Sequence, residues 1–179
     1  MVKRFRSVWK PDWTDRARSM SMSPRDIVTT ASLIETEAKL AEERPLVASV
    51  IYNRLQKNIA LAVDSSVIYA SKLEGKWRYD GKVYRSDIER RSPYNTRIYP
   101  GLPPGPVASP GESSLKAALN PATSDYLYYV RNPDRDDGAH NFYSNGGDFE
   151  TGVQALRRWE RERDEEEARK KRESNGQPE

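Results

Sequence analysis

Residues 27–38 read Ile27-Val28-Thr29-Thr30-Ala31-Ser32-Leu33-Ile34-Glu35-Thr36-Glu37-Ala38, and this stretch decides the fold. Its apolar side chains recur at intervals of three and four residues (Ile27, Ala31, Ile34 and Ala38), which is the spacing of one face of an α-helix. On a helical wheel Glu35 falls within this apolar arc, whereas Glu37 points away from it. We therefore expect Glu35 to face the interior of the protein and Glu37 to face outward.

A carboxylate on an apolar helix face has two interpretations. Burial disfavours the charged form, so a carboxyl group in an apolar cleft has a raised pKa, holds a proton near neutral pH and serves as a general acid. The alternative is a buried acid paired with an arginine, in a chain that carries 30 Lys and Arg residues. The catalytic interpretation requires Glu35 to stay protonated, so an arginine directly on its carboxyl group would count against it.

The amino-acid composition limits which classes of protein this chain can belong to. A length of 179 residues suggests one domain with appendages, and a net charge of +3 does not demand a nucleic-acid partner. The chain has no cysteine and a single histidine, His140, which excludes disulfides, thiolate zinc sites and multi-histidine metal centres. No apolar run approaches the ~20 residues that span a bilayer, and the first residues lack the apolar segment of a signal peptide.

The pattern predicts three parts. Residues 1–22 mix basic side chains with Phe5, Trp9 and Trp13, and we expect a lead-in helix that packs its aromatic rings on the domain, with a nucleic-acid-binding arm as the alternative. Residues 23–159 form the main domain. Residues 160–179 are almost entirely charged, which predicts a solvated helical extension with a disordered end.

Within the main domain the signals alternate between helix starts and turns. Ser23-Pro24 and Ser109-Pro110 are each a cap followed by proline, Asp64 is a candidate cap for a short helix, and a further helix is expected through residues 46–55. Prolines and glycines make 94–106 a stiff, shaped loop. Residues 126–130 and 140–144 are strand-like and predict a small hairpin, followed by a helix from about Phe149.

The ordered set of segments resembles one family, the endolytic murein transglycosylases of the YceG-like (MltG) type. The resemblance spans about residues 24–158, and its motifs are specific in their order and spacing. They are Ala31 to Glu37, Glu43 to Leu55, Asp64 to Tyr69, Tyr94-Asn95-Thr96, Gly101 to Pro106, Ser109-Pro110-Gly111, Tyr126 to Val130, and Gly138 to Phe142. The implied fold is α+β: a helical, lysozyme-like catalytic core, a small antiparallel β element at 126–145 and a charged C-terminal helix.

The resemblance also implies a reaction. Family members cleave the β-1,4 bond between N-acetylmuramic acid and N-acetylglucosamine inside glycan strands without water, leaving a 1,6-anhydro-muramyl end. Matching positions makes Glu35 the catalytic acid. It would act as acid and then as base, because the sugar's own 6-hydroxyl replaces the second carboxylate of a glycosidase. No metal or organic cofactor is implied. The expected substrate-binding residues are Asp64, Ser66, Tyr94, Asn95, Thr96 and His140.

Two departures from the family pattern stand out. Ala62 and Ser65 occupy positions where the family usually has a glutamine and a proline, which bears on the sugar subsite. The transmembrane helix and LysM-like module that usually precede the catalytic domain are not in this chain. Work at the cell envelope, on the outer face of the cytoplasmic membrane, therefore follows from the family alone. We expect membrane contact only through segments outside this chain, and cell-wall synthesis proteins as candidate partners.

Three other functions stay open at this point. The first is a peptidoglycan-binding domain that no longer turns over substrate. The second is a two-carboxylate muramidase hydrolase, in which Asp64 or Glu37 would be the second acid. The third, a nucleic-acid-binding protein, is suggested by the basic and aromatic residues at the N-terminus.

Overall fold

A computed structural model describes residues 7–175 of the chain, with the side chain of residue 175 left out. Its elements are α2 (Pro11–Ser19), α3 (Pro24–Glu37), the 3-10 turn η1 (Ala41–Glu43), α4 (Arg44–Gln56), α5 (Asp64–Leu73), α6 (Arg85–Ile88), α7 (Glu112–Leu119), β1 (Tyr128–Arg131), β2 (His140–Tyr143) and α8 (Gly146–Asn175). The expected α+β architecture, with a helical core and a small hairpin, is confirmed.

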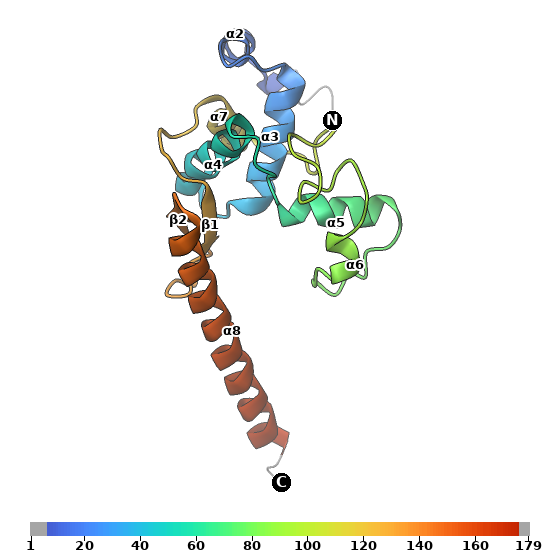
Figure 1. Cartoon of the computed structure of the whole chain (residues 1–179), viewed down its shortest axis with the longest axis vertical. Helices are drawn as coiled ribbons and strands as arrows, with labels where there is room; N and C mark the ends of the chain where they lie inside the picture. Colours follow the sequence, from blue (N-terminus) through green and yellow to red (C-terminus); the bar gives the residue numbers. More distant parts are fainter. Residues whose placement is uncertain (1–6, 176–179) are drawn as a thin grey trace.

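Helix α3 is the centre of the fold (Figure 1) and packs against α4, α5 and α7. It starts as the sequence predicts, because the Ser23 hydroxyl accepts from the Asp26 amide and Asp26 in turn accepts from the Ser23 amide. Ile27 and Ile34 have no exposed surface, and burying each contributes roughly 1.5–3 kcal/mol. The apolar face inferred from the sequence is therefore the one that forms the core.

The N-terminal segment packs on this core through its aromatic side chains. Trp9 and Trp13 meet edge to face, with ring centroids 5.7 Å apart, and both lie against the buried cluster. This agrees with the expected lead-in segment, whereas Phe5 lies outside the described residues. Arg16 on α2 donates to the Leu119 carbonyl at the end of α7, which ties α2 to the domain.

The hairpin and α8 form an arm on one side of the core, and α5 with α6 forms a lobe on the other (Figure 1). Strands β1 and β2 are antiparallel, and Tyr129 lies opposite Phe142. The start of α8 docks on the hairpin, where Phe149 stacks on Tyr128 at 4.8 Å. From residue 160 onward every described side chain of α8 is exposed.

The structure corrects two helix starts. Asp64 is the first residue of α5 and not its cap, which is Val63. Helix α7 begins at Glu112 with Gly111 as its cap residue, so the Ser109 hydroxyl does not cap it. Since glycine has no side chain, α7 takes its acceptor from elsewhere in the fold. Within residues 7–175 no helix combines the length and apolar character needed to cross a membrane.

Candidate active site

Glu35 supplies the acceptor that helix α7 lacks. The Gly111 amide donates to Glu35 Oε2 at 3.0 Å, and the Ser114 hydroxyl donates to the same oxygen at 2.6 Å. Arg44 Nη2 lies 3.9 Å from Oε1. Burial by itself raises the pKa of Glu35, but the two hydrogen bonds and the charge of Arg44 outweigh it and leave the pKa below its usual value. The expectation of a raised pKa at Glu35 is wrong.

Glu37 has the environment that was expected for Glu35. It is the last residue of α3, and its Oε2 accepts a hydrogen bond from the Tyr129 hydroxyl at 2.9 Å. Burial raises the pKa of Glu37 and the charge of Asp64 raises it further. Hydrogen bonds from Tyr129 and Ser65 and the charge of His140 offset only part of that rise. The expectation that Glu37 faces outward is therefore wrong.

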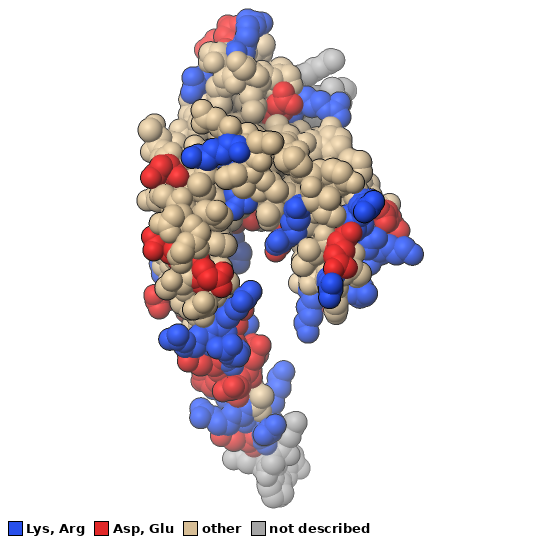
Figure 2. All heavy atoms as spheres, in the orientation of Figure 1, with Lys and Arg blue, Asp and Glu red and all other residues tan. Residues whose placement is uncertain are grey.

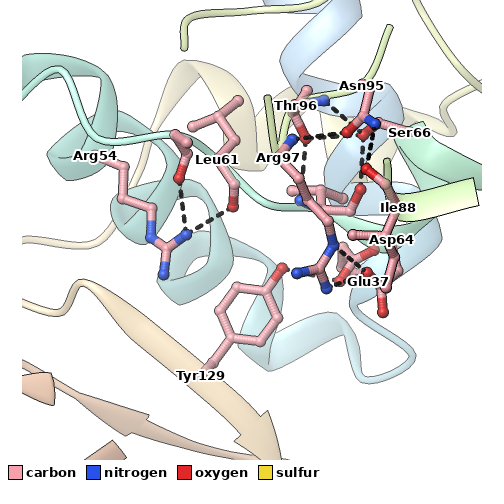
Figure 3. A network of polar contacts seen from close by, with 12 residues as sticks. Glu37, Arg54, Leu61, Asp64, Ser66, Ile88, Asn95, Thr96, Arg97 and Tyr129 are labelled. Carbon is pink, nitrogen blue, oxygen red and sulfur yellow. Dashed lines mark hydrogen bonds and ion pairs between the residues drawn. The ribbon is translucent and has the colours of Figure 1, made fainter. Parts of the chain in front are cut away.

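Glu37 lies between the two halves of the molecule. Figure 2 shows that the surface is hollowed between the arm and the lobe, with Lys and Arg side chains beside the hollow. In Figure 3 the Tyr129 hydroxyl, from the arm, points toward Glu37, and the Arg97 guanidinium, from the loop that follows Thr96, points toward Asp64. Arg97 Nε donates to Asp64 Oδ1 at 3.0 Å, so the acid of α5 has a cationic partner at this place.

Three of the expected substrate-binding residues lie inside the protein. The hydroxyls of Ser66 and Thr96 are 2.8 Å apart, and Thr96 also accepts from the Val63 amide. The Asn95 side chain donates to the carbonyls of Ile88 and Arg90. Since all three are buried and bonded to protein groups, the structure gives them the role of framing the loop in place of the expected sugar contact.

The remaining expected residues keep accessible surface. Asp64 is exposed and borders Glu37, as described above. Tyr94 is half-buried and packs on Tyr69 with ring centroids 4.8 Å apart. His140 is on β2, as expected for a strand near the site, and its ring meets the Tyr129 ring edge to face at 5.3 Å. Substrate contact by these three stays a prediction.

Two groups that shape this site, Tyr129 and Arg54, were not among the site residues expected from the sequence. Tyr129 was placed only in a strand-like run, although a tyrosine among apolar strand residues needs a partner for its hydroxyl. Arg54 was placed only within a motif. Its guanidinium donates to the carbonyls of Ala60, Leu61 and Leu127, so it ties α4 both to the segment before α5 and to the strand that carries Tyr129. Burial lowers the pKa of Arg54, and Figure 3 shows its side chain reaching toward Leu61.

No group of three or more His, Asp or Glu side chains within the described part of the chain is arranged to hold a metal ion. The chemistry available at Glu37 is proton transfer by a carboxyl group of raised pKa beside a tyrosine hydroxyl.

Comparison with known proteins decides the family. Residues 1–155 match the YceG-like family. The chain belongs to that family. It is 41% identical over 130 residues to an endolytic murein transglycosylase of Bacillus subtilis (strain 168), a match that covers 73% of this chain. It is 34% identical over 113 residues to an endolytic murein transglycosylase of Streptococcus pneumoniae (strain D39), covering 63% of this chain.

A solved YceG-like structure shares the fold. The crystal structure of a putative yceG-like protein from Listeria monocytogenes matches with a TM-score of 0.68 and 36% identity, over 79% of this chain and 43% of that chain. The aligned segments make up 34% of the Bacillus subtilis relative and 20% of the Streptococcus pneumoniae relative. This YceG-like chain thus spans about a third or less of the curated relatives it matches.

Proposed function

We propose that this chain is the catalytic part of an endolytic lytic transglycosylase. Its substrate would be the glycan strand of peptidoglycan, cut at the β-1,4 bond between N-acetylmuramic acid and N-acetylglucosamine to leave 1,6-anhydro-muramyl ends. Two relatives carry the name endolytic murein transglycosylase. The observation that carries the proposal is the carboxyl group of Glu37: burial and the charge of Asp64 raise its pKa, and its Oε2 accepts a hydrogen bond from Tyr129 of the arm.

The proposed acid is Glu37 and not Glu35. A general acid must hold a proton at the pH at which it works, and burial favours that state for Glu37. At Glu35 the donors Gly111 and Ser114 both stabilise the charged form, and one oxygen accepts from both of them. Glu35 therefore serves as the cap of α7, a structural role that differs from the arginine pair considered for it above.

The reaction needs one carboxyl group. Protonated Glu37 gives its proton to the glycosidic oxygen as the bond from that oxygen to C1 of the muramyl residue breaks. The acetamido group of the sugar stabilises the cationic centre. The 6-hydroxyl oxygen then bonds to C1 and its proton passes to the Glu37 carboxylate, which restores the starting acid without consuming water. The Tyr129 hydroxyl donates to the carboxylate between the two steps and keeps it in place.

A two-carboxylate hydrolase is less consistent with the contacts. Asp64 is the other acid near Glu37, but it is exposed and held by Arg97. In that mechanism the second acid must activate water or attack the sugar. The Arg97 guanidinium already binds Oδ1 of Asp64, which leaves that oxygen unavailable to a water or a sugar.

Glu37→Gln tests the proposal, with Glu35→Gln as the matched control. Purified variants are incubated with sacculi and the products are analysed by mass spectrometry. We expect Glu37→Gln to lower anhydro-muropeptide formation by about 10²–10⁴-fold, the contribution of a positioned acid, and folded Glu35→Gln to stay within a few-fold of wild type. The reverse order of the two variants would refute the choice of acid. Reducing-end products would indicate a hydrolase, and sacculus binding without products would indicate a binding domain.

The proposed substrate fixes where the protein works. Peptidoglycan lies outside the cytoplasmic membrane, so we place the activity at the cell envelope, with cell-wall synthesis proteins as candidate partners. Digestion of a tagged protein by external protease in wall-stripped cells tests the location, and protection of the tag in intact protoplasts would contradict it.

A further inference from the structure

Glu43 is a buried acid that the proposed reaction does not use. It ends η1, directly before α4, and only 7% of its surface is exposed. Both of its oxygens are bound by one residue of β2: the His140 amide donates to Oε1 at 2.8 Å, and His140 Nδ1 lies 2.8 Å from Oε2. Glu43 thus fastens the hairpin to the turn between α3 and α4 through two contacts.

The contact with Glu43 sets the tautomer of the His140 ring. A carboxylate has no proton to donate, so the hydrogen bond at Nδ1 requires Nδ1 to carry the proton. In the neutral ring Nε2 is then the acceptor nitrogen. Nε2 points away from Glu43 because the two ring nitrogens are directed to opposite sides of imidazole. Among residues 7–175 no side chain or backbone group hydrogen-bonds to it.

The same ring borders the residue that holds Glu37. His140 lies opposite Arg131 in the hairpin, two positions along β1 from Tyr129 and on the same face of the sheet. Its ring packs edge to face against the Tyr129 ring at 5.3 Å, and the Tyr129 hydroxyl donates to Glu37. When its ring is protonated, His140 also lowers the pKa of Glu37 through its charge. A continuous set of contacts therefore runs from Glu43 to Glu37.

We infer that Glu43 is a positioning residue: it locks His140 as the Nδ1–H tautomer, which holds Tyr129 against Glu37 and leaves Nε2 as an acceptor at the edge of the site. The effect on catalysis rests on the proposed function, whereas the tautomer does not. A carboxylate that is hydrogen-bonded to one ring nitrogen of a functional histidine fixes the orientation of the ring and determines which nitrogen carries the proton. The neighbouring Glu42 is exposed, and within residues 7–175 no hydrogen bond or ion pair joins it to His140, which makes it a matched control.

Nitrogen-15 NMR of the imidazole ring tests the tautomer directly. His140 is the only histidine in the chain, so the ring signals need no assignment. At a pH where the ring is neutral, we expect the wild type and Glu42→Gln to carry the proton on Nδ1. We expect Glu43→Gln to carry it on Nε2, because the Gln amide donates to Nδ1. A wild-type ring protonated on Nε2, or a ring that Glu43→Gln leaves unchanged, would overturn the inference.

Kinetics on sacculi test the positioning role. We expect Glu43→Gln to lower kcat at least about tenfold, which is part of the ~10²–10⁴-fold that a positioned acid contributes. Its KM should stay within about threefold of the wild-type value. In Glu42→Gln both kcat and KM should be unchanged. An unchanged kcat in Glu43→Gln would overturn the role. If Glu43→Gln melts below the assay temperature, the His140→Asn variant is measured in its place. The Asn side-chain amide still donates a hydrogen bond to Glu43, but the imidazole ring that packs on Tyr129 is gone. We expect the same loss of kcat. Wild-type inactivity would refute the proposed function, and the ring spectrum would still decide the tautomer.

Discussion

Replacement of Glu35 separates its capping role from catalysis. In Glu35→Ala both donors to Oε2, the Gly111 amide and the Ser114 hydroxyl, lose their acceptor. A hydrogen bond to a charged group contributes roughly 1.5–3 kcal/mol, and the 30% exposure of the Glu35 side chain places each bond at the lower end of that range. We therefore expect Glu35→Ala to lower the free energy of unfolding by about 2–4 kcal/mol. For a domain of this size that lowers the melting temperature by about 4–16 °C.

Glu35→Gln keeps one oxygen that accepts both hydrogen bonds but loses the charge. Charge-assisted bonds are roughly twice as strong as neutral ones, and a negative charge at a helix N-terminus adds about 0.3–1 kcal/mol, so the expected loss is about 1–2 kcal/mol. Because the folded pKa of Glu35 is lowered, this contribution is present above the unfolded pKa near ~4.3 and is lost as the pH falls through the folded pKa.

Thermal unfolding followed by circular dichroism between pH 3 and pH 7 measures both effects. We expect the melting temperatures of wild type and Glu35→Gln to differ at pH 7 and to approach each other as the pH falls below the unfolded pKa of about 4.3. A capping role for Glu35 is refuted if Glu35→Ala has the melting temperature of the wild type. It is also refuted if the melting temperatures of wild type and Glu35→Gln differ by the same amount at pH 3 and pH 7. The Ser114→Ala variant removes one donor and should give an intermediate loss.

Three further predictions concern the pKa of the acid and the backbone. Ser65→Ala removes a hydrogen bond that lowers the pKa of Glu37, so the alkaline limb of the kcat profile should move to higher pH, and a move to lower pH would contradict this. Ala62 has a φ of 55°, so Ala62→Gly should raise the free energy of unfolding by up to about 1 kcal/mol in urea titrations; a loss would show that the site tolerates alanine without strain. A Cβ on Gly152 would lie 2.7 Å from Cζ of Tyr143, so Gly152→Ala should lower the free energy of unfolding by about 1–3 kcal/mol in the same urea titrations. An unchanged urea midpoint would show that α8 and Tyr143 move apart without loss of stability.

Local signals in the sequence determined most of the secondary structure. The capping box at Ser23 and the three-four spacing of apolar residues fix α3 because both act within one or two turns of chain. The hairpin follows from two β-rich runs joined by a turn-rich segment. The start of α7 was misplaced because its acceptor comes from Glu35, 76 residues away, which no local pattern contains.

The surroundings of Glu35 and Glu37 were misjudged for a related reason. A helical wheel ranks side chains by direction around the axis, and Glu35 does lie on the buried side of α3. What matters for its pKa is which groups meet it there, and these are the donors of α7. Glu37 points away from that face, yet it is the last residue of the helix and is enclosed by Tyr129 from the hairpin. Direction around a helix does not reveal what packs against its end.

The sequence alone thus determined the helices, the hairpin and the family, because each depends on short-range periodicity, turn chemistry or the order of motifs along the chain. The tertiary structure decided which of two neighbouring acids has a raised pKa and which a lowered one. That choice depends on the balance between burial and donated hydrogen bonds, and the groups that set the balance, at Gly111, Ser114, Tyr129 and His140, come from distant parts of the chain. Only folding brings them to α3.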